Sequence, residues 1–165
     1  MPKELKLIFV FLFILPIITF SLLVFKTQST PVLAKINGLE SPATSYQLGD
    51  VPRLGGVITK EYAFNNNTDK TMTLYKITTS CMCTKAKVVV DGKETKFFGL
   101  EHTGDKNAPV NLDIKPGQTA KVVFEFDPSA HGPKGVGEFD RTIQLIFSEP
   151  QGVQEFKFNG NVVEK

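Results

Sequence analysis

The chain has 165 residues, of which 41% are hydrophobic and 22% are charged, and its formal net charge is +2. This length suggests one domain together with a separate N-terminal segment. The four charged residues before position 27, Lys3, Glu4, Lys6 and Lys26, already sum to +2, so the remainder is neutral in sum. A neutral domain of mixed signs lacks the basic footprint of nucleic-acid-binding proteins, and we expect no nucleic-acid partner.

The first predicted element is the uncharged run LIFVFLFILPIITFSLLVF, residues 7–25. As a helix, these nineteen residues extend about 28 Å at ~1.5 Å per residue, close to the roughly 30 Å of a bilayer core. Pro16 is tolerated in a membrane-spanning helix, and Lys3 and Lys6 before the run favour a cytoplasmic N-terminus. We therefore predict one transmembrane helix, with residues 1–26 as a single-pass membrane anchor and everything after it extracytoplasmic.

A cleaved signal peptide is the alternative. The apolar run is longer than the roughly 7–15 residues typical of a signal-peptide core, which favours the uncleaved anchor. The small residue Ala34 in Val32-Leu33-Ala34 nevertheless provides a candidate cleavage site, after which the protein would be secreted.

A linker and one domain are expected to follow. Residues 27–43 are small and polar with two prolines, and we interpret them as a linker to a domain that spans residues 44–165. In that domain apolar and polar residues alternate, as they do in half-buried strands. In TAKVVFEFDP, for example, Val122, Phe124 and Phe126 share one face.

Segments with this alternation are separated by turn residues and lie at 56–64, 71–79, 83–90, 111–114, 119–128, 139–149 and 153–163. About seven short strands without a convincing helical period predict an all-β fold, an immunoglobulin-like β-sandwich. Nine of the fourteen phenylalanines lie in this part and are expected to fill the space between two sheets. The chain has no tryptophan and its two cysteines are two positions apart, which excludes the antibody-type core.

The stretch YQLGDVPRLGGVITKEYAFNNNTDKTMTLYKITTSCMCT, residues 46–84, resembles the start of a bacterial domain-of-unknown-function family. Members of that family are immunoglobulin-like, are related to the major sperm protein and Hydin-type modules, and typically carry an S-C-G-C-T motif. Here the motif reads Ser80-Cys81-Met82-Cys83-Thr84, and the later KPGQTAKVVFEFDP also fits the family pattern. The resemblance covers roughly residues 46–163 and implies the fold, whereas the family has no settled activity.

Two details of the resemblance concern a site. Met82 replaces the usual glycine, so the backbone between the cysteines cannot freely take a positive φ. One subgroup of the family also carries a G-x-x-H and an A-H-G-x-x-G-x-G segment, which are present here as FFGLEHTG and SAHGPKGVGEF. These segments contain His102 and His131, the only histidines of the chain.

Three interpretations of Cys81 and Cys83 stay open. On an extended strand, residues two apart lie roughly 6.6–6.8 Å from one another. A disulfide needs Cβ atoms about 3.5–4.5 Å apart, so this bridge requires a bent backbone and would be redox-labile. Two buried free thiols are less compatible with an oxidising exported compartment. A metal site asks less of the backbone, because sulfurs on one zinc ion lie roughly 3.7 Å apart at Zn–S distances of ~2.3 Å.

We predict one metal site formed by Cys81, Cys83, His102 and His131 at an end of the sandwich. Two thiolates and two imidazoles match a structural zinc site, and soft thiolates equally suit Cu(I). A loop histidine is more often simply solvated, and only the joint occurrence of all four residues in matching segments raises the metal hypothesis. On a strand Met82 would point away from the cysteines, so we expect it in the core rather than as a ligand.

Two classes of function follow. The first is a membrane-held binding or scaffolding module that contacts another protein through a sheet edge or loops. The second is a zinc- or copper-binding domain that uses the C-M-C motif and the two loop histidines. Enzymatic activity is not expected, since the sequence has no Gly-rich phosphate loop, no HExxH pattern and no local cysteine-protease signature.

Overall fold

The computed structural model describes residue 3, residues 33–101 and residues 106–164. The predicted transmembrane segment and His102 lie outside the described residues. Within the described part, no helix is both long and apolar enough to cross a membrane. Residues from Leu33 onward form one compact unit.

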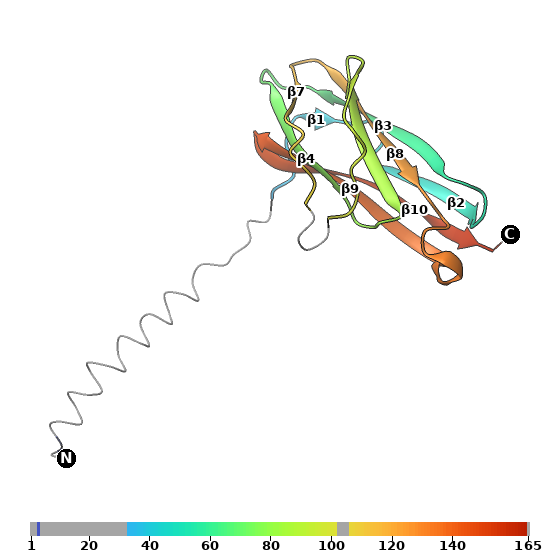
Figure 1. Cartoon of the computed structure of the whole chain (residues 1–165). Coiled ribbons are helices and arrows are strands. Elements are labelled where there is room, and N and C mark those ends of the chain that lie inside the picture. Colours follow the sequence, from blue (N-terminus) through green and yellow to red (C-terminus); the bar gives the residue numbers. More distant parts are fainter. Residues whose placement is uncertain (1–2, 4–32, 102–105, 165) are drawn as a thin grey trace. The chain divides into compact units, whose positions relative to one another are not determined.

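Two sheets make up this unit, and both have five strands within the described residues. The first sheet has the order β1 (Leu39–Glu40), β3 (Ile58–Asn66), β8 (Thr119–Phe126), β5 (Thr84–Val90), β6 (Lys93–Glu94). The second has the order β2 (Ser45–Pro52), β10 (Gln151–Val163), β9 (Gly137–Glu149), β4 (Met72–Thr79), β7 (Leu112–Ile114). Only the β2–β10 pair is parallel among these strands. The predicted all-β sandwich is confirmed (Figure 1).

The strands number ten in the described residues, not about seven. The unexpected strands are β1, β2 and β6. β1 and β6 have two residues each, which is too short for any alternation to show. β2 is an edge strand in which Tyr46 and Leu48 alternate, but a register shift against β10 interrupts the period before Val51, its one buried residue. Two-residue strands and a strand with an interrupted period thus give no clear alternation of apolar and polar residues.

The core lies between the two sheets and is built from the alternating residues of the long strands. Phe124 is fully buried, and its ring stacks at 4.5 Å from that of Phe158 of the opposite sheet. Tyr62 packs against both sheets as well, with its ring 5.5 Å from Phe124 and 4.8 Å from Phe156. The predicted inward face of residues 119–126 is therefore confirmed.

The expected linker of residues 27–43 requires a correction, because its second half belongs to the sandwich. Ile36 is only 4% exposed, and its N–H donates to the carbonyl of Val153 at 3.0 Å. Gly152 permits this close approach, since a Cβ there would lie 3.0 Å from that of Ile36. With β1 paired to β3, the start of the domain moves from residue 44 to residue 33.

The chain enters the sandwich at one end and leaves it at the other. Lys35 pairs with Val153 near the start of β10, whereas Val162 near its end pairs with Gly137. β10 has thirteen residues and spans about 40 Å at ~3.3 Å per residue. Figure 1 accordingly shows the C-terminus at the opposite end of the sandwich from the segment after residue 32. The β8–β9 connection lies at the C-terminal end, since Gly137 pairs with Val162, whereas the β4–β5 connection follows Thr79, which pairs with Ile143 in the middle of β9.

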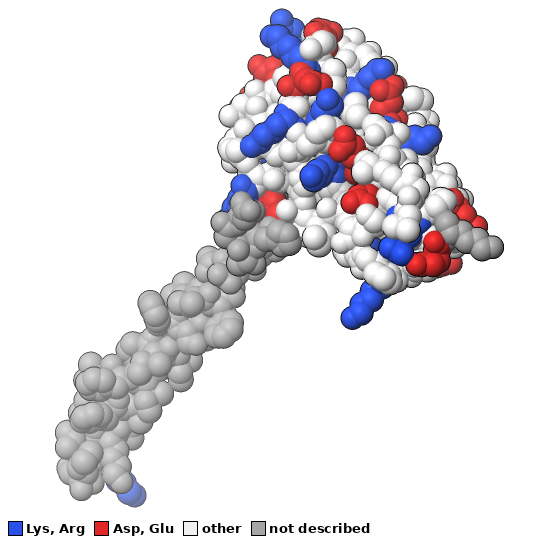
Figure 2. Space-filling model, turned by 45° about the vertical axis from the view of Figure 1, so that its right-hand side comes forward, with Lys and Arg blue, Asp and Glu red and all other residues white. Residues whose placement is uncertain are grey.

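Charged side chains are interspersed over the surface. Figure 2 shows lysines and arginines alternating with acidic residues over the visible face of the described domain. Ion pairs such as Lys121–Glu61, at 2.8 Å, join opposite charges on neighbouring strands. This arrangement agrees with the neutral charge sum of the domain.

Candidate thiol and metal centre

The C-M-C segment lies where the chain crosses from one sheet to the other. β4 ends at Thr79 in the second sheet, and β5 begins at Thr84 in the first. The N–H of Thr84 donates to the carbonyl of Cys81 at 3.1 Å, which closes a tight turn. The buried hydroxyl of Thr79 lies 3.0 Å from the carbonyl oxygens of both Cys81 and Thr84. Threonines on both sides therefore hold the turn from within the protein.

Met82 occupies the tip of this turn and is 58% exposed. Its expected place in the core is wrong, because the cysteines lie in a turn and not on a strand. The backbone at this position does not need a glycine either. Asp91 and Asn111 are the non-glycine residues with positive φ in the described ranges, and Met82 is not among them.

Cys81 and Cys83 are joined by a disulfide. Their Cα atoms lie 5.3 Å apart, closer than the roughly 6.6–6.8 Å of an extended strand. The turn thus supplies the bend that an i,i+2 bridge needs. Both residues are buried, with exposed fractions of 9% for Cys81 and 4% for Cys83. Of the three interpretations left open by the sequence, the structure therefore has the disulfide.

His131 reaches the disulfide from the β8–β9 connection. Its Nε2 lies 3.1 Å from Sγ of Cys81, while the residue as a whole is exposed. The connection is tied to the turn by the N–H of Asp127, which donates to the carbonyl of Cys83 at 2.9 Å. The carboxylate of Asp127 in turn accepts hydrogen bonds from the N–H and the hydroxyl of Ser129, at 2.8 and 2.7 Å.

The glycines after His131 have a steric role in this placement. Gly132 has a φ of +61°, a conformation that other residues rarely adopt. A Cβ at Gly135 would lie 2.8 Å from Cβ of His131, so a larger residue there would displace the histidine. The spacing of the HGPKG segment therefore positions the imidazole.

Arg141 contacts the second sulfur, a role that was not predicted from the sequence. Its Nε donates to Sγ of Cys83 at 3.2 Å, and its NH1 donates to the carbonyl of Asp140 at 2.8 Å. The guanidinium also lies over the ring of Phe139, and burial lowers the pKa of Arg141. A signal was present, since Arg141 stands between Phe139 and Ile143 in the apolar register of β9. We call Cys81, Cys83, His131 and Arg141 the thiol centre.

Three of the four predicted metal ligands are described, and the structure brings them together. The sulfurs of Cys81 and Cys83 and a ring nitrogen of His131 all lie within 4.8 Å of one another. The placement of His102 is outside the described residues, so its part in the site stays a prediction.

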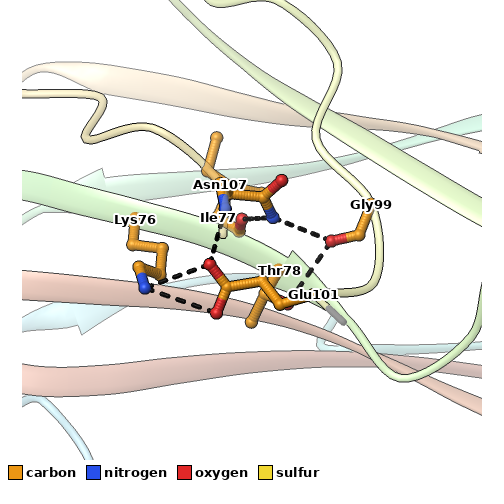
Figure 3. Close-up of polar contacts among 6 residues, drawn as sticks. All are labelled: Lys76, Ile77, Thr78, Gly99, Glu101 and Asn107. Carbon is orange, nitrogen blue, oxygen red and sulfur yellow. Dashed lines mark hydrogen bonds and ion pairs between the residues drawn. The ribbon is translucent and has the colours of Figure 1, made fainter. Parts of the chain in front are cut away.

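Residues on either side of 102–105 form hydrogen bonds and an ion pair with β4 (Figure 3). Glu101 pairs with Lys76 at 3.1 Å and accepts a hydrogen bond from the N–H of Asn107 at 2.7 Å. The amide of Asn107 donates to the carbonyls of Ile77 and Gly99 at 3.0 and 2.9 Å. Glu101 and Asn107 are thus both held at the part of β4 that leads into the C-M-C turn.

A hollow of about 440 Å³ lies beside the thiol centre. His131 and Arg141, which contact the two sulfurs, are both part of its lining, together with Phe126, Lys134 and Glu138. A ligand in this hollow would therefore lie next to the two side chains that contact the disulfide.

The comparisons with known proteins agree with the fold. Residues 39–99 match the family described as "Protein of unknown function (DUF1573)". This segment includes both cysteines. That an S-C-G-C-T motif is typical of the family stays a prediction. A search of curated proteins gave no match.

Solved structures with a similar fold include a protein of unknown function from Porphyromonas gingivalis W83. It is 18% identical with a TM-score of 0.54, and the alignment covers 83% of this chain and 50% of the other. The chain thus spans half the length of that protein. The ASH/PapD-like domain 7 of human CEP192 is 14% identical with a TM-score of 0.47, covering 84% of this chain and 92% of that domain. The first likeness supports the fold alone.

Proposed function

We propose that this chain is an extracytoplasmic immunoglobulin-like domain that binds a thiophilic metal ion through Cys81, Cys83 and His131 once its disulfide is reduced. The observation that carries the proposal is the convergence of the three donor atoms within 4.8 Å. Two thiolates at metal-bonding distance sit roughly 3.7 Å apart, so reduction and a small separation of the sulfurs are sufficient.

The charges of the centre favour Cu(I) over zinc. Two thiolates and one neutral imidazole form a soft three-donor set, which suits Cu(I). The Cu(I) complex would carry one negative charge, and the guanidinium of Arg141, 3.2 Å from Cys83 Sγ, would offset it. A structural zinc site normally has four protein ligands, so zinc would need a fourth donor such as His102.

We further propose that residues 7–25 hold the protein in the membrane with the domain outside. The uncharged run behind Lys3 and Lys6 supports this topology. Protease added to intact spheroplasts should degrade the domain, and full protection of the domain would contradict the topology. A mature N-terminus after Ala34 would instead support the secreted alternative.

Metal binding is tested by competition between the full chain in detergent and a chromophoric Cu(I) chelator, under reducing conditions. We expect about one Cu(I) per chain for the native protein, and loss of binding in Cys81→Ser, Cys83→Ser and His131→Ala. Met82→Ala is the matched control and should bind normally, since the exposed thioether is no ligand in this proposal. His102→Ala tests the fourth predicted ligand separately. Retention of Cu(I) by a variant that carries both Cys81→Ser and Cys83→Ser would overturn the proposal.

A protein-binding role is the second candidate, favoured by exposed apolar side chains at the same end of the sandwich. Leu54 and Val57 of the β2–β3 connection are exposed, as is Met82. Ile58 and Thr84, which follow these two connections, both pair with Phe126. Binding of a partner at this end should be lost in the variants Leu54→Asp and Met82→Asp. It should be retained in the variant that carries both Cys81→Ser and Cys83→Ser. The reverse pattern would assign the interaction to the thiols.

A further inference from the structure

The two sulfurs of the disulfide have different surroundings. Sγ of Cys83 accepts a hydrogen bond from Nε of Arg141 at 3.2 Å and is the more deeply buried of the two. Sγ of Cys81 lies 3.1 Å from Nε2 of His131, which is exposed to solvent. A disulfide whose two ends are so distinct can react in a defined direction.

We propose that the Cys81–Cys83 disulfide undergoes thiol–disulfide exchange with an external dithiol, in which Cys81 is attacked and Cys83 is the leaving thiolate. This activity goes beyond metal binding and does not depend on it, although the same sulfurs serve both. Reduction of the disulfide is the step that would make both thiolates available to a metal.

Arg141 explains why Cys83 leaves. When the S–S bond breaks, negative charge develops on the departing sulfur, and a charged N–H donor directed at it stabilises that charge. Arg141 is already aligned for this, since it is fixed by the carbonyl of Asp140 and lies over the ring of Phe139. Better stabilised thiolates leave faster in exchange reactions.

Access explains why Cys81 is attacked. Both cysteines are buried, but Cys81 is the less deeply buried, with an exposed fraction of 9% against 4% for Cys83, and the exposed His131 lies beside its sulfur. Neither cysteine lines the hollow of about 440 Å³, but His131, which contacts Sγ of Cys81, does, so the remainder of an incoming thiol would lie beside that histidine. The N–H of Cys83, 3.3 Å from Sγ of Cys81, stabilises the Cys81 thiolate when it is released in the second step.

The two steps balance as follows. One thiolate of the external dithiol bonds to Sγ of Cys81, the Cys81–Cys83 bond breaks, and its electron pair stays on Cys83. The second thiolate of the reagent then bonds to the reagent sulfur of this mixed disulfide and expels the Cys81 thiolate. The external dithiol loses two electrons and becomes a disulfide, and Cys81 and Cys83 gain two electrons and take up the two protons from the reagent.

The first experiment tests reactivity with the full chain in detergent and with a metal chelator present, so that metal binding plays no part. The oxidised protein is treated with dithiothreitol, with reduced glutathione, two molecules of which supply the two thiolates of the dithiol, or with a reduced thioredoxin-type protein, and its thiols are alkylated and counted by mass. We expect two thiols per chain with unchanged circular dichroism. The glutathione and protein arms distinguish a small thiol from a protein thiol as the reductant. Failure of all three reagents on the folded protein would overturn the proposal.

The second experiment tests direction with single-cysteine variants. Cys83→Ser retains only Cys81, and we expect it to form a mixed disulfide with oxidised glutathione about tenfold faster than Cys81→Ser, which retains only Cys83. Equal rates, or a faster reaction at Cys83, would overturn the assigned direction. Both variants are compared in the folded state. The measured quantity is the rate of mixed-disulfide formation, which does not depend on metal affinity.

The third experiment tests Arg141. Arg141→Met should slow reduction by dithiothreitol by about tenfold, and Arg141→Lys should restore most of the rate because it retains a cationic donor. Arg53→Met is the matched control, since Arg53 pairs with Glu164 and does not contact the sulfurs. An Arg141→Met rate equal to that of the control would remove Arg141 from the mechanism. If Arg141→Met does not fold, two other results still decide the proposal. They are the rate of reduction of Arg141→Lys relative to that of the native protein, and the rates of the single-cysteine variants.

Discussion

Nε2 of His131 lies 3.1 Å from Sγ of Cys81, although the two residues are 50 positions apart in the sequence. The contact joins a turn between the two sheets to the β8–β9 connection. It depends on the hydrogen bond from Asp127 to Cys83 and on the glycines that follow the histidine. Substitutions at residues that do not contact sulfur should therefore change the position of the imidazole.

Gly135→Ala should move the imidazole away from the disulfide, because the new methyl group would lie 2.8 Å from Cβ of His131. We expect weaker Cu(I) binding in the chelator competition with an intact fold by circular dichroism. Gly99→Ala is the control, since a Cβ there meets nothing closer than 3.6 Å. Identical Cu(I) affinity in the two variants would show that the position of His131 does not matter for the metal.

Phe124→Ala should destabilise the domain strongly. The side chain is fully buried and packs on Tyr62 and Phe158, so its removal leaves a cavity between the sheets. We expect a loss of about 3–5 kcal/mol in the free energy of unfolding, measured by urea denaturation. Phe97→Ala, at a partly exposed position, should cost clearly less. A change below about 1 kcal/mol for Phe124→Ala would contradict the burial of its ring between the two sheets.

A domain that begins at residue 33 should be more stable than one that begins at residue 44. The shorter chain lacks the buried side chain of Ile36, its hydrogen bond to Val153 and the β1–β3 pairing. Burial of one isoleucine contributes about 1.5–3 kcal/mol, and we expect a difference of at least this size in urea denaturation. Ile36→Ala in the longer chain should reproduce much of it. Equal stability of the two chains would restore the linker interpretation of residues 33–43.

The stability of the domain should fall at alkaline pH through Tyr62. Burial raises the pKa of Tyr62, and its hydroxyl donates to the carbonyl of Lys157. Below pH ~10 the phenol is protonated in both folded and unfolded chains, so it causes no pH dependence there. Above that pH the unfolded chain releases the proton while the folded chain retains it, which favours unfolding.

Tyr62→Phe is the test of this effect. The variant should lose a hydrogen bond, and its unfolding free energy should decline less steeply above pH ~10 than that of the native protein. Tyr75→Phe, at an exposed position, should decline as the native protein does. Parallel curves for Tyr62→Phe and the native domain would contradict the prediction.

The fold class was predictable because a half-buried strand has a period of two, whatever lies opposite. Val122, Phe124 and Phe126 alternate in the sequence and are buried in the structure. β2 and β1 lack a clear signature, because the period of β2 is interrupted between Leu48 and Val51 and β1 has only two residues. β2 and the pairing of residues 33–43 were therefore missed.

The thiol centre was predictable only in its components. The sequence by itself determined that two thiols stand two positions apart and that His131 lies in a Gly-rich loop. Only the tertiary structure decided that Cys81 and Cys83 lie in a turn that joins them, that Met82 faces solvent, and that Arg141 reaches Cys83. Local periodicity reports which face of a strand is buried, whereas contacts between a turn, a loop and a strand depend on the packing of two sheets, which no local pattern encodes.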